Sequence, residues 1–109
     1  MNEKQAISMF GALSQETRLQ IVRYLVERGE DGASAGAVGA EVGASSSRAS
    51  FHLSALENSG LIGSERQSRS IIYRANMENL GGLVSFLLND CCGSHPNILA
   101  CCKIGPDGC

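Results

Sequence analysis

The chain has 109 residues, of which 43% are hydrophobic and 18% are charged, and its formal net charge is -2. This length fits a single small domain, and the composition excludes a disordered chain or a coiled coil. Lys4, Gln5 and Ser8 interrupt the apolar stretch near the N-terminus, which argues against a signal peptide or a membrane-spanning helix. We therefore expect a cytoplasmic protein that does not contact a membrane.

The charge is spread unevenly along the chain. Residues 45–74 hold an excess of bases over acids: Arg48, Arg66, Arg69 and Arg74 against Glu57 and Glu65. A basic stretch in an acidic chain is a weak indication of a surface that faces nucleic-acid phosphates, and an ordinary solvated surface is the alternative.

Two helices are predicted in the N-terminal part of the chain. Apolar residues recur at helical spacing in both: Ala6, Ile7, Phe10 and Leu13 in the first, and Leu19, Ile21, Val22, Leu25 and Val26 in the second. Ser14 is the expected N-cap of the second helix, and Gly29 is its expected end.

Residues 29–47 are rich in glycine, alanine and serine, and their composition alone is typical of a linker. Val38 and Val42 nevertheless stand four positions apart, as on one face of a helix. Ser34 is a suitable N-cap, and Gly43 stands where a C-terminal glycine is expected. The stretch therefore predicts a short helix weakened by its glycines.

A longer helix is predicted between the N-cap Ser45 and Gly60. One face is apolar and carries Ala49, Leu53 and Leu56. The other face is mostly small and polar: Ser46, Ser47, Arg48, Ser50 and Phe51.

The apolar period changes after this helix. Residues 70–74 contain β-branched and aromatic side chains that favour a strand, and residues 61–65 can pair with it. With an exposed turn at residues 67–69, the sequence predicts a β-hairpin that carries Arg66 and Arg69 near its tip.

The last predicted helix follows the N-cap Asn76 and has a broad apolar stripe: Leu80, Leu83, Val84, Leu87 and Leu88. Gly81 and Gly82 each disfavour this helix by roughly 1 kcal/mol relative to alanine, so packing has to compensate. Proline and glycine beyond it argue against further helix. We therefore expect a folded domain at residues 1–90 and an irregular, cysteine-rich tail at residues 91–109.

These elements follow one another in the order of a winged helix-turn-helix, so the expected fold is mainly α with a β-hairpin wing (α+β). Such a fold suits DNA, because a helix fits the major groove and its small polar side chains reach base edges. Arginines on the wing hold phosphate or enter the minor groove. A small helical domain with a solvated, serine-rich helix is the alternative.

Three segments resemble the ArsR/SmtB family of winged-helix repressors: "ALSQETRLQIVRYL", "SSSRASFHLSALENSGLI" and "IIYRA". The resemblance covers residues 12–88. It implies a homodimer, joined mainly through its first and last helices, that binds palindromic double-stranded operator DNA near the genes that it represses.

The resemblance also assigns groove-facing positions on the second helix of the helix-turn-helix: Ser46, Ser47, Arg48, Ser50 and Phe51. Arg66 and Arg69 on the wing are expected to neutralise phosphate. His52 has two interpretations, a phosphate contact or a half-buried side chain beside Leu56.

Two metal sites found in this family are missing from the sequence. The segment "SAGAVGAEV" lacks the Cys-x-Cys that some members place beside the recognition helix, and "NMENLGGLVSFLLND" lacks the histidine that others use to bind zinc. An arsenic-responsive subgroup is similar in carrying a cysteine pair just after the last helix. Its third cysteine typically follows the proline by three residues, where this chain has Leu99.

All five cysteines fall near the C-terminus: Cys91, Cys92, Cys101, Cys102 and Cys109. Cytosolic thiols stay reduced and an odd number makes a poor disulfide framework, so we interpret the cluster as a soft metal or metalloid site. Trivalent arsenic or antimony prefers three thiolates, which Cys91 and Cys92 supply with either Cys101 or Cys102. Zinc or cadmium with His95, a thiol-disulfide switch and an inert tail are alternatives, and Cys109 is expected to be a bystander.

A small thiol enzyme is the competing class of protein. Its cysteine would need a lowered pKa, at a helix N-terminus or in Cys-x-x-Cys, whereas these cysteines follow a predicted helix C-terminus and form no such motif. We therefore expect a protein that is not an enzyme. It would be a repressor that trivalent arsenic or antimony releases from operator DNA, with zinc, cadmium or thiol redox as alternative signals.

Overall fold

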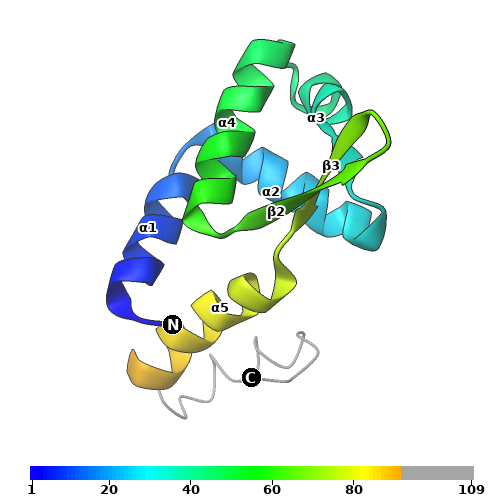
Figure 1. Ribbon diagram of the computed structural model, residues 1–109. Helices are drawn as coiled ribbons and strands as arrows, with labels where there is room; N and C mark the ends of the chain where they lie inside the picture. The colour runs from blue at the N-terminus through cyan, green and yellow to red at the C-terminus, as the bar shows by residue number, and fades with distance from the viewer. Residues whose placement is uncertain (92–109) are drawn as a thin grey trace.

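The computed structural model describes residues 1–91, and their side chains up to residue 88. Its elements are α1 (Glu3–Leu13), α2 (Glu16–Arg28), the 3-10 turn η1 (Gly29–Asp31), β1 (Ala33–Ser34), α3 (Ala35–Val42), α4 (Ser46–Ser59), β2 (Ile62–Gln67), β3 (Ser70–Ala75) and α5 (Met77–Cys91) (Figure 1). The predicted fold class is confirmed. The chain is a mainly helical winged helix-turn-helix, in which α3 and α4 form the helix-turn-helix and the β2–β3 hairpin forms the wing.

Local sequence sets most helix ends where they were predicted. Ser34, Ser45 and Asn76 are N-caps, and the side chain of each accepts a hydrogen bond from the backbone N–H three residues further on. Gly43 and Gly60 end α3 and α4 in the left-handed region, with φ of 70° and 89°. Both positions suit glycine because it has no Cβ.

The predicted N-cap of α2 is wrong by one residue. Gln15 caps this helix, because its side-chain oxygen accepts from the backbone N–H of Arg18 at 2.9 Å. The Ser14 hydroxyl donates instead to the carbonyl of Gly11 at 2.8 Å. Ser14 therefore belongs to the end of α1, whose last turn engages its side chain.

The sheet has one strand more than the predicted hairpin. The strand order is β1-β3-β2, all antiparallel, and β1 is a two-residue strand that pairs Ala33 with Tyr73. In the wing, Gln67 pairs with Ser70, so the loop holds only two residues and the predicted three-residue turn is wrong. Ser68 in this loop has a φ of 54°, which fits the tight two-residue connection.

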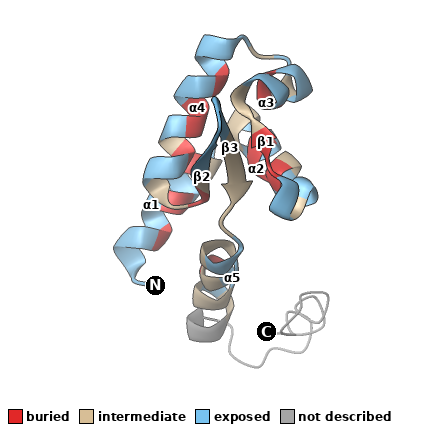
Figure 2. Ribbon diagram, turned by 45° about the vertical axis from the view of Figure 1, so that its right-hand side comes forward, coloured by how far each residue is buried: buried red, intermediate tan, exposed pale blue. Residues whose placement is uncertain are grey.

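One hydrophobic core lies where α2, α3, α4 and the base of the wing meet. Its fully buried large side chains are Ile21, Leu25, Val38, Leu53, Leu56 and Leu61. In Figure 2 the buried residues of α4 follow one side of the helix, and its other side is exposed. The predicted apolar face of α4 is thus confirmed.

The apolar stripe of α5 is divided between two environments. Leu83 is buried in the core cluster, whereas Val84 and Leu87 are exposed. Ile7 and Phe10 on α1 are also exposed. Figure 1 shows α5 leading away from the wing along the end of the molecule where α1 begins.

Candidate nucleic-acid interface

The outer face of α4 presents small polar side chains on a rigid element. All five residues assigned to this face are exposed: Ser46, Ser47, Arg48, Ser50 and Phe51. Ser45 caps the helix at its N-terminal end, so the capped first turn fixes the start of this face. The face has the shape and chemistry of a recognition helix, and its contacts with DNA bases remain predictions.

The close approach of α3 and α4 depends on a glycine. Gly39 is buried, and a Cβ added there would lie 2.9 Å from the carbonyl oxygen of Ala44 and 3.4 Å from the Cβ of Ala49. Only glycine therefore fits at this crossing without a shift of the backbone. The stretch that looked like a linker by composition is the packing surface that orients the recognition helix.

His52 is the one polar residue among the buried residues of the described chain, with 7% of its surface exposed. Its Nδ1 accepts a hydrogen bond from Nε of Arg18 at 3.1 Å, so the neutral ring carries its proton on Nε2. Burial lowers the pKa of His52, and the charges of Arg18 and Arg48 lower it further. The geometry favours the buried interpretation, and any phosphate contact would have to come from Nε2.

Arg18 is a residue of this surface for which the sequence suggested no role. It stands in the first turn of α2, and its guanidinium lies 5.8 Å from the centre of the Phe51 ring. In the sequence, Arg18 shows only that a basic residue in a first helical turn opposes the helix dipole. This does not identify a partner, and the contacts of Arg18 appear only in the fold.

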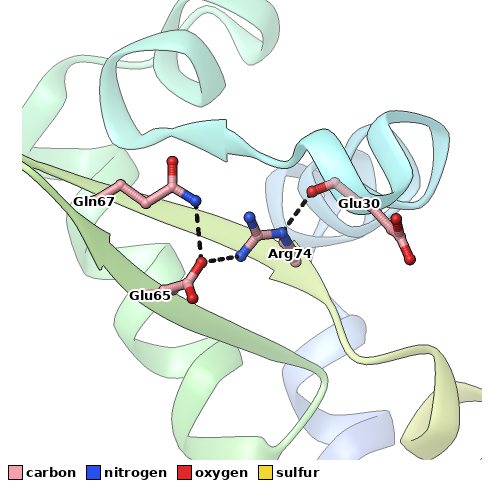
Figure 3. Close-up of polar contacts among 4 residues, drawn as sticks. All are labelled: Glu30, Glu65, Gln67 and Arg74. Carbon is pink, nitrogen blue, oxygen red and sulfur yellow. Dashed lines mark hydrogen bonds and ion pairs between the residues drawn. The ribbon is translucent and has the colours of Figure 1, made fainter.

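The wing carries two kinds of arginine. Arg66 and Arg69 are exposed near its tip, and within residues 1–88 neither makes a salt bridge. Arg74 is engaged, because its Nη1 lies 3.0 Å from the Glu65 carboxylate and its Nε donates to the carbonyl of Glu30 at 2.6 Å (Figure 3). The wing therefore offers Arg66 and Arg69 to a ligand, while Arg74 braces the hairpin against η1.

The carboxylate of Glu65 is the centre of this brace. Its Oε1 accepts hydrogen bonds from Gln67 Nε2 and from Arg74 Nη1, each at 3.0 Å. The hydrogen bond from Gln67 lowers the pKa of Glu65, and the bond and charge of Arg74 lower it further. Glu65 is thus held as a carboxylate, and it neutralises one base of the locally basic stretch.

The predicted metal-binding cysteines lie outside the described side chains. Cys91 is the last residue of α5, and Cys92, Cys101 and Cys102 follow the described residues. Helix α5 continues to Cys91, one residue past the predicted end of the folded domain, and the division into residues 1–90 and 91–109 stays a prediction. Up to residue 88, no group of three His, Cys, Asp or Glu side chains is placed to hold a metal ion.

None of the helices in the described part of the chain is long and apolar enough to cross a membrane.

Comparison with known proteins gives the chain a family. Residues 13–64 match the family described as "Helix-turn-helix domain". The chain is 34% identical over 89 residues to the HTH-type transcriptional regulator YgaV of Escherichia coli (strain K12), covering 82% of this chain and 88% of YgaV.

Solved structures agree with this relationship. An ArsR-like transcriptional regulator from Rhodococcus sp. RHA1 superposes with a TM-score of 0.71 at 31% identity, covering 93% of this chain and 92% of the other. The homodimeric winged helix-turn-helix DNA-binding domain Mb0332 from Mycobacterium bovis gives 0.65 at 26% identity, covering 85% and 86%. YgaV and the Rhodococcus protein are transcriptional regulators, Mb0332 is described as a possible one, and none of the three is described as an enzyme. The chain therefore belongs to the ArsR-like family of DNA-binding, winged helix-turn-helix transcriptional regulators.

Proposed function

We propose that this regulator is a homodimeric repressor that binds palindromic operator DNA and leaves it when trivalent arsenic or antimony binds its C-terminal thiols. The DNA-binding part of this proposal rests on the exposed serine and arginine face of α4. The same domain carries a wing with exposed arginines near its tip. Small polar side chains on a helix read base edges, and the flanking arginines supply sequence-independent phosphate binding.

The exposed apolar residues of α1 and α5 support the homodimer. Ile7, Phe10, Val84 and Leu87 each keep between 42% and 63% of their surface exposed. Apolar side chains gathered on two terminal helices of so small a domain favour association with a second copy. The related Mb0332 domain is described as homodimeric, which agrees with this assembly.

The position of the thiols supports the sensor. Cys91 is the last residue of α5, and Cys92 follows it directly, so ligand binding would act on the end of a proposed dimerisation helix. Trivalent arsenic and antimony favour three soft sulfur ligands, which Cys101 or Cys102 would complete. Zinc or cadmium, with a fourth ligand, and a thiol-disulfide switch are the competing signals.

A rigid joint between α5 and α4 would carry the signal to DNA. The side-chain amide of Asn79 donates to the carbonyl of Gly60 at 2.8 Å, and the backbone N–H of Asn76 donates to the carbonyl of Leu61 at 2.9 Å. The start of α5 is thus tied to the end of the recognition helix. A change in dimer geometry would reorient both recognition helices, and a coupling of about 1–3 kcal/mol would suffice for release.

Operator release is the experiment that tests the sensor. Labelled operator DNA, selected by the wild-type protein from a random duplex pool, is titrated with arsenite, antimonite, zinc and cadmium, and release is followed by fluorescence anisotropy. We expect arsenite and antimonite to release the wild type. Cys91→Ser and Cys92→Ser should bind DNA normally yet resist release, because serine keeps the size of cysteine and loses the soft donor.

Cys109→Ser is the matched control and should respond like the wild type. Unequal loss of response in Cys101→Ser and Cys102→Ser would identify the third ligand. Normal release by arsenite after both Cys91 and Cys92 have been replaced would contradict the proposed site, and release by zinc or oxidant alone would favour one of the competing signals.

A further inference from the structure

Arg18 of α2 is held against the recognition helix by two neighbouring residues of α4. Its Nε donates to His52 Nδ1 at 3.1 Å, across 34 positions of sequence, and its guanidinium carbon lies 5.8 Å from the centre of the Phe51 ring. Phe51 is 65% exposed and belongs to the outer face of α4. The guanidinium therefore lies where α2 meets the exposed surface of the recognition helix.

The charge of Arg18 is not neutralised within the described residues. The one ion pair found among residues 1–88 joins Arg74 to Glu65, so no carboxylate lies within ion-pair distance of Arg18. Its position in the first turn of α2 is unfavourable for a cation, because the helix dipole is positive there. Arg48 adds a second positive charge close enough to act on the same histidine. The fold thus keeps an unbalanced positive charge beside α4.

His52 orients this charge and adds none of its own. Nδ1 accepts a hydrogen bond only when it carries no proton, so the contact with Arg18 requires the neutral ring. Nε is one of the five N–H donors of a guanidinium, and its bond to His52 is the one side-chain hydrogen bond that Arg18 donates within the described residues. The donors on Nη1 and Nη2 remain for an external acceptor.

We propose that Arg18 binds a DNA backbone phosphate at the edge of the recognition surface, where His52 and Phe51 hold its guanidinium in place. The proposal rests on the DNA-binding function of the family and extends the interface to α2, outside the helix-turn-helix and the wing. Phosphate is the expected acceptor because the outer face of α4 would occupy the groove, which brings the neighbouring α2 towards a flanking strand. A guanidinium pairs with phosphate through two parallel hydrogen bonds.

The salt dependence of DNA binding tests this proposal. Binding of full-length wild type and Arg18→Gln to a fluorescein-labelled, random-sequence duplex is measured by anisotropy over a range of salt concentrations. Each lost phosphate contact reduces the slope of log K against log salt by about 0.9, so a dimer should lose about 1.8. Glutamine retains an N–H donor for His52, so the variant removes the charge while keeping a hydrogen-bond donor.

Arg23→Gln is the matched control, because Arg23 is an exposed arginine of the same helix that lines a groove with Tyr24 and Glu41. It should keep the wild-type slope, as should Arg18→Lys, which retains the charge. Thermal unfolding followed by circular dichroism checks the fold of every variant. If Arg18→Gln unfolds, Arg18→Met replaces it as a neutral side chain that packs on Phe51.

The outcomes separate the two hypotheses. A wild type that binds no duplex DNA would contradict the DNA-binding function itself. A wild type that binds with a clear salt slope, and an Arg18→Gln variant with the same slope, would overturn the phosphate contact alone. Weaker binding at an unchanged slope would likewise overturn it, and would make Arg18 a residue that only positions α4.

Discussion

The contact between His52 and Arg18 gives a hydrogen-bond partner to the one buried polar side chain of the described residues. His52 keeps only 7% of its surface exposed and faces two arginines, Arg18 and Arg48. A protonated ring would add a third positive charge and would lose the acceptor for Arg18. The packing of the recognition helix therefore depends on a neutral histidine.

This dependence predicts a loss of stability in mild acid. Because the pKa of His52 in the folded protein lies below its usual value of 6.5, the unfolded chain binds the proton more readily. The contribution of neutral His52 to stability is fully present above about pH 6.5, its pKa in the unfolded chain. It is lost as the pH falls through the pKa of His52 in the folded protein. Chemical denaturation at several pH values measures this loss of stability. The experiment uses a His95→Gln background, which leaves His52 as the one histidine.

His52→Gln in the same background is the comparison. Its free energy of unfolding should depend less on pH in this window, because glutamine does not titrate and its side-chain oxygen still accepts from Arg18. Identical pH profiles for the two proteins would show that protonation of His52 has no part in stability.

At the level of elements, the angle between α3 and α4 is set by close backbone approach at Gly39. Gly36 lies on the same short helix and is exposed, and the nearest atom to an added Cβ there is Oγ of Ser34, 3.9 Å away. The two glycines thus share a helix and differ in their surroundings. This difference makes a matched pair of substitutions.

Gly36→Ala and Gly39→Ala should change stability in opposite directions. Alanine at position 36 should raise the free energy of unfolding by about 0.5–1 kcal/mol through helix propensity. Alanine at position 39 should lower it by about 1–3 kcal/mol, because the methyl group forces α3 away from α4. Urea denaturation of both variants measures the difference, and equal or greater stability of Gly39→Ala would refute the packing argument.

Most elements could be predicted because their signals are local. Ser34, Ser45 and Asn76 act as caps within three residues of their partners, and the apolar face of α4 follows a helical period. The extra strand β1 was missed because its two residues are ordered by pairing with β3 and carry no pattern of their own.

The candidate site was less predictable, because its contacts join distant parts of the sequence. The outer face of α4 followed from periodicity. Arg18 meets His52 across 34 positions, and Arg74 meets Glu30 across 44 positions, so tertiary packing alone decides which arginines are engaged. By sequence, Arg74 counts among the bases of a locally basic stretch. In the fold it pairs with Glu65 and donates a hydrogen bond to the carbonyl of Glu30.

At the level of the whole molecule, the apolar stripe of α5 contains both a buried residue, which stabilises the fold, and exposed residues, which are available for assembly. Leu83 is 5% exposed and belongs to the core, whereas Leu87 is 46% exposed. Both leucines stand on the same predicted apolar stripe, so their spacing alone does not distinguish them. The structure assigns Leu83 to the stability of one protomer and leaves Leu87 available for a second copy.

Leu87→Glu should therefore give a folded monomer, because a charge on an exposed apolar face opposes dimerisation without disturbing the core. Leu83→Glu should unfold the protomer, since it buries an unpaired carboxylate. Sedimentation velocity with circular dichroism distinguishes the two. Ile71→Glu, an exposed apolar residue on the wing, is the control and should stay dimeric. A wild type that is monomeric at micromolar concentration would exclude the dimer.

The ion pair of Arg74 also shapes how the molecule would meet DNA. With Arg74 neutralised by Glu65, free positive charge on the α4 surface and the wing is limited to a few arginines, on a chain whose net charge is -2. Electrostatic attraction is screened beyond about 8 Å at physiological salt, so only collisions that already present this basic surface are favoured. In the proposed complex, encounters through other faces of the acidic chain would be disfavoured, and discrimination between sequences would rest on the serines of α4.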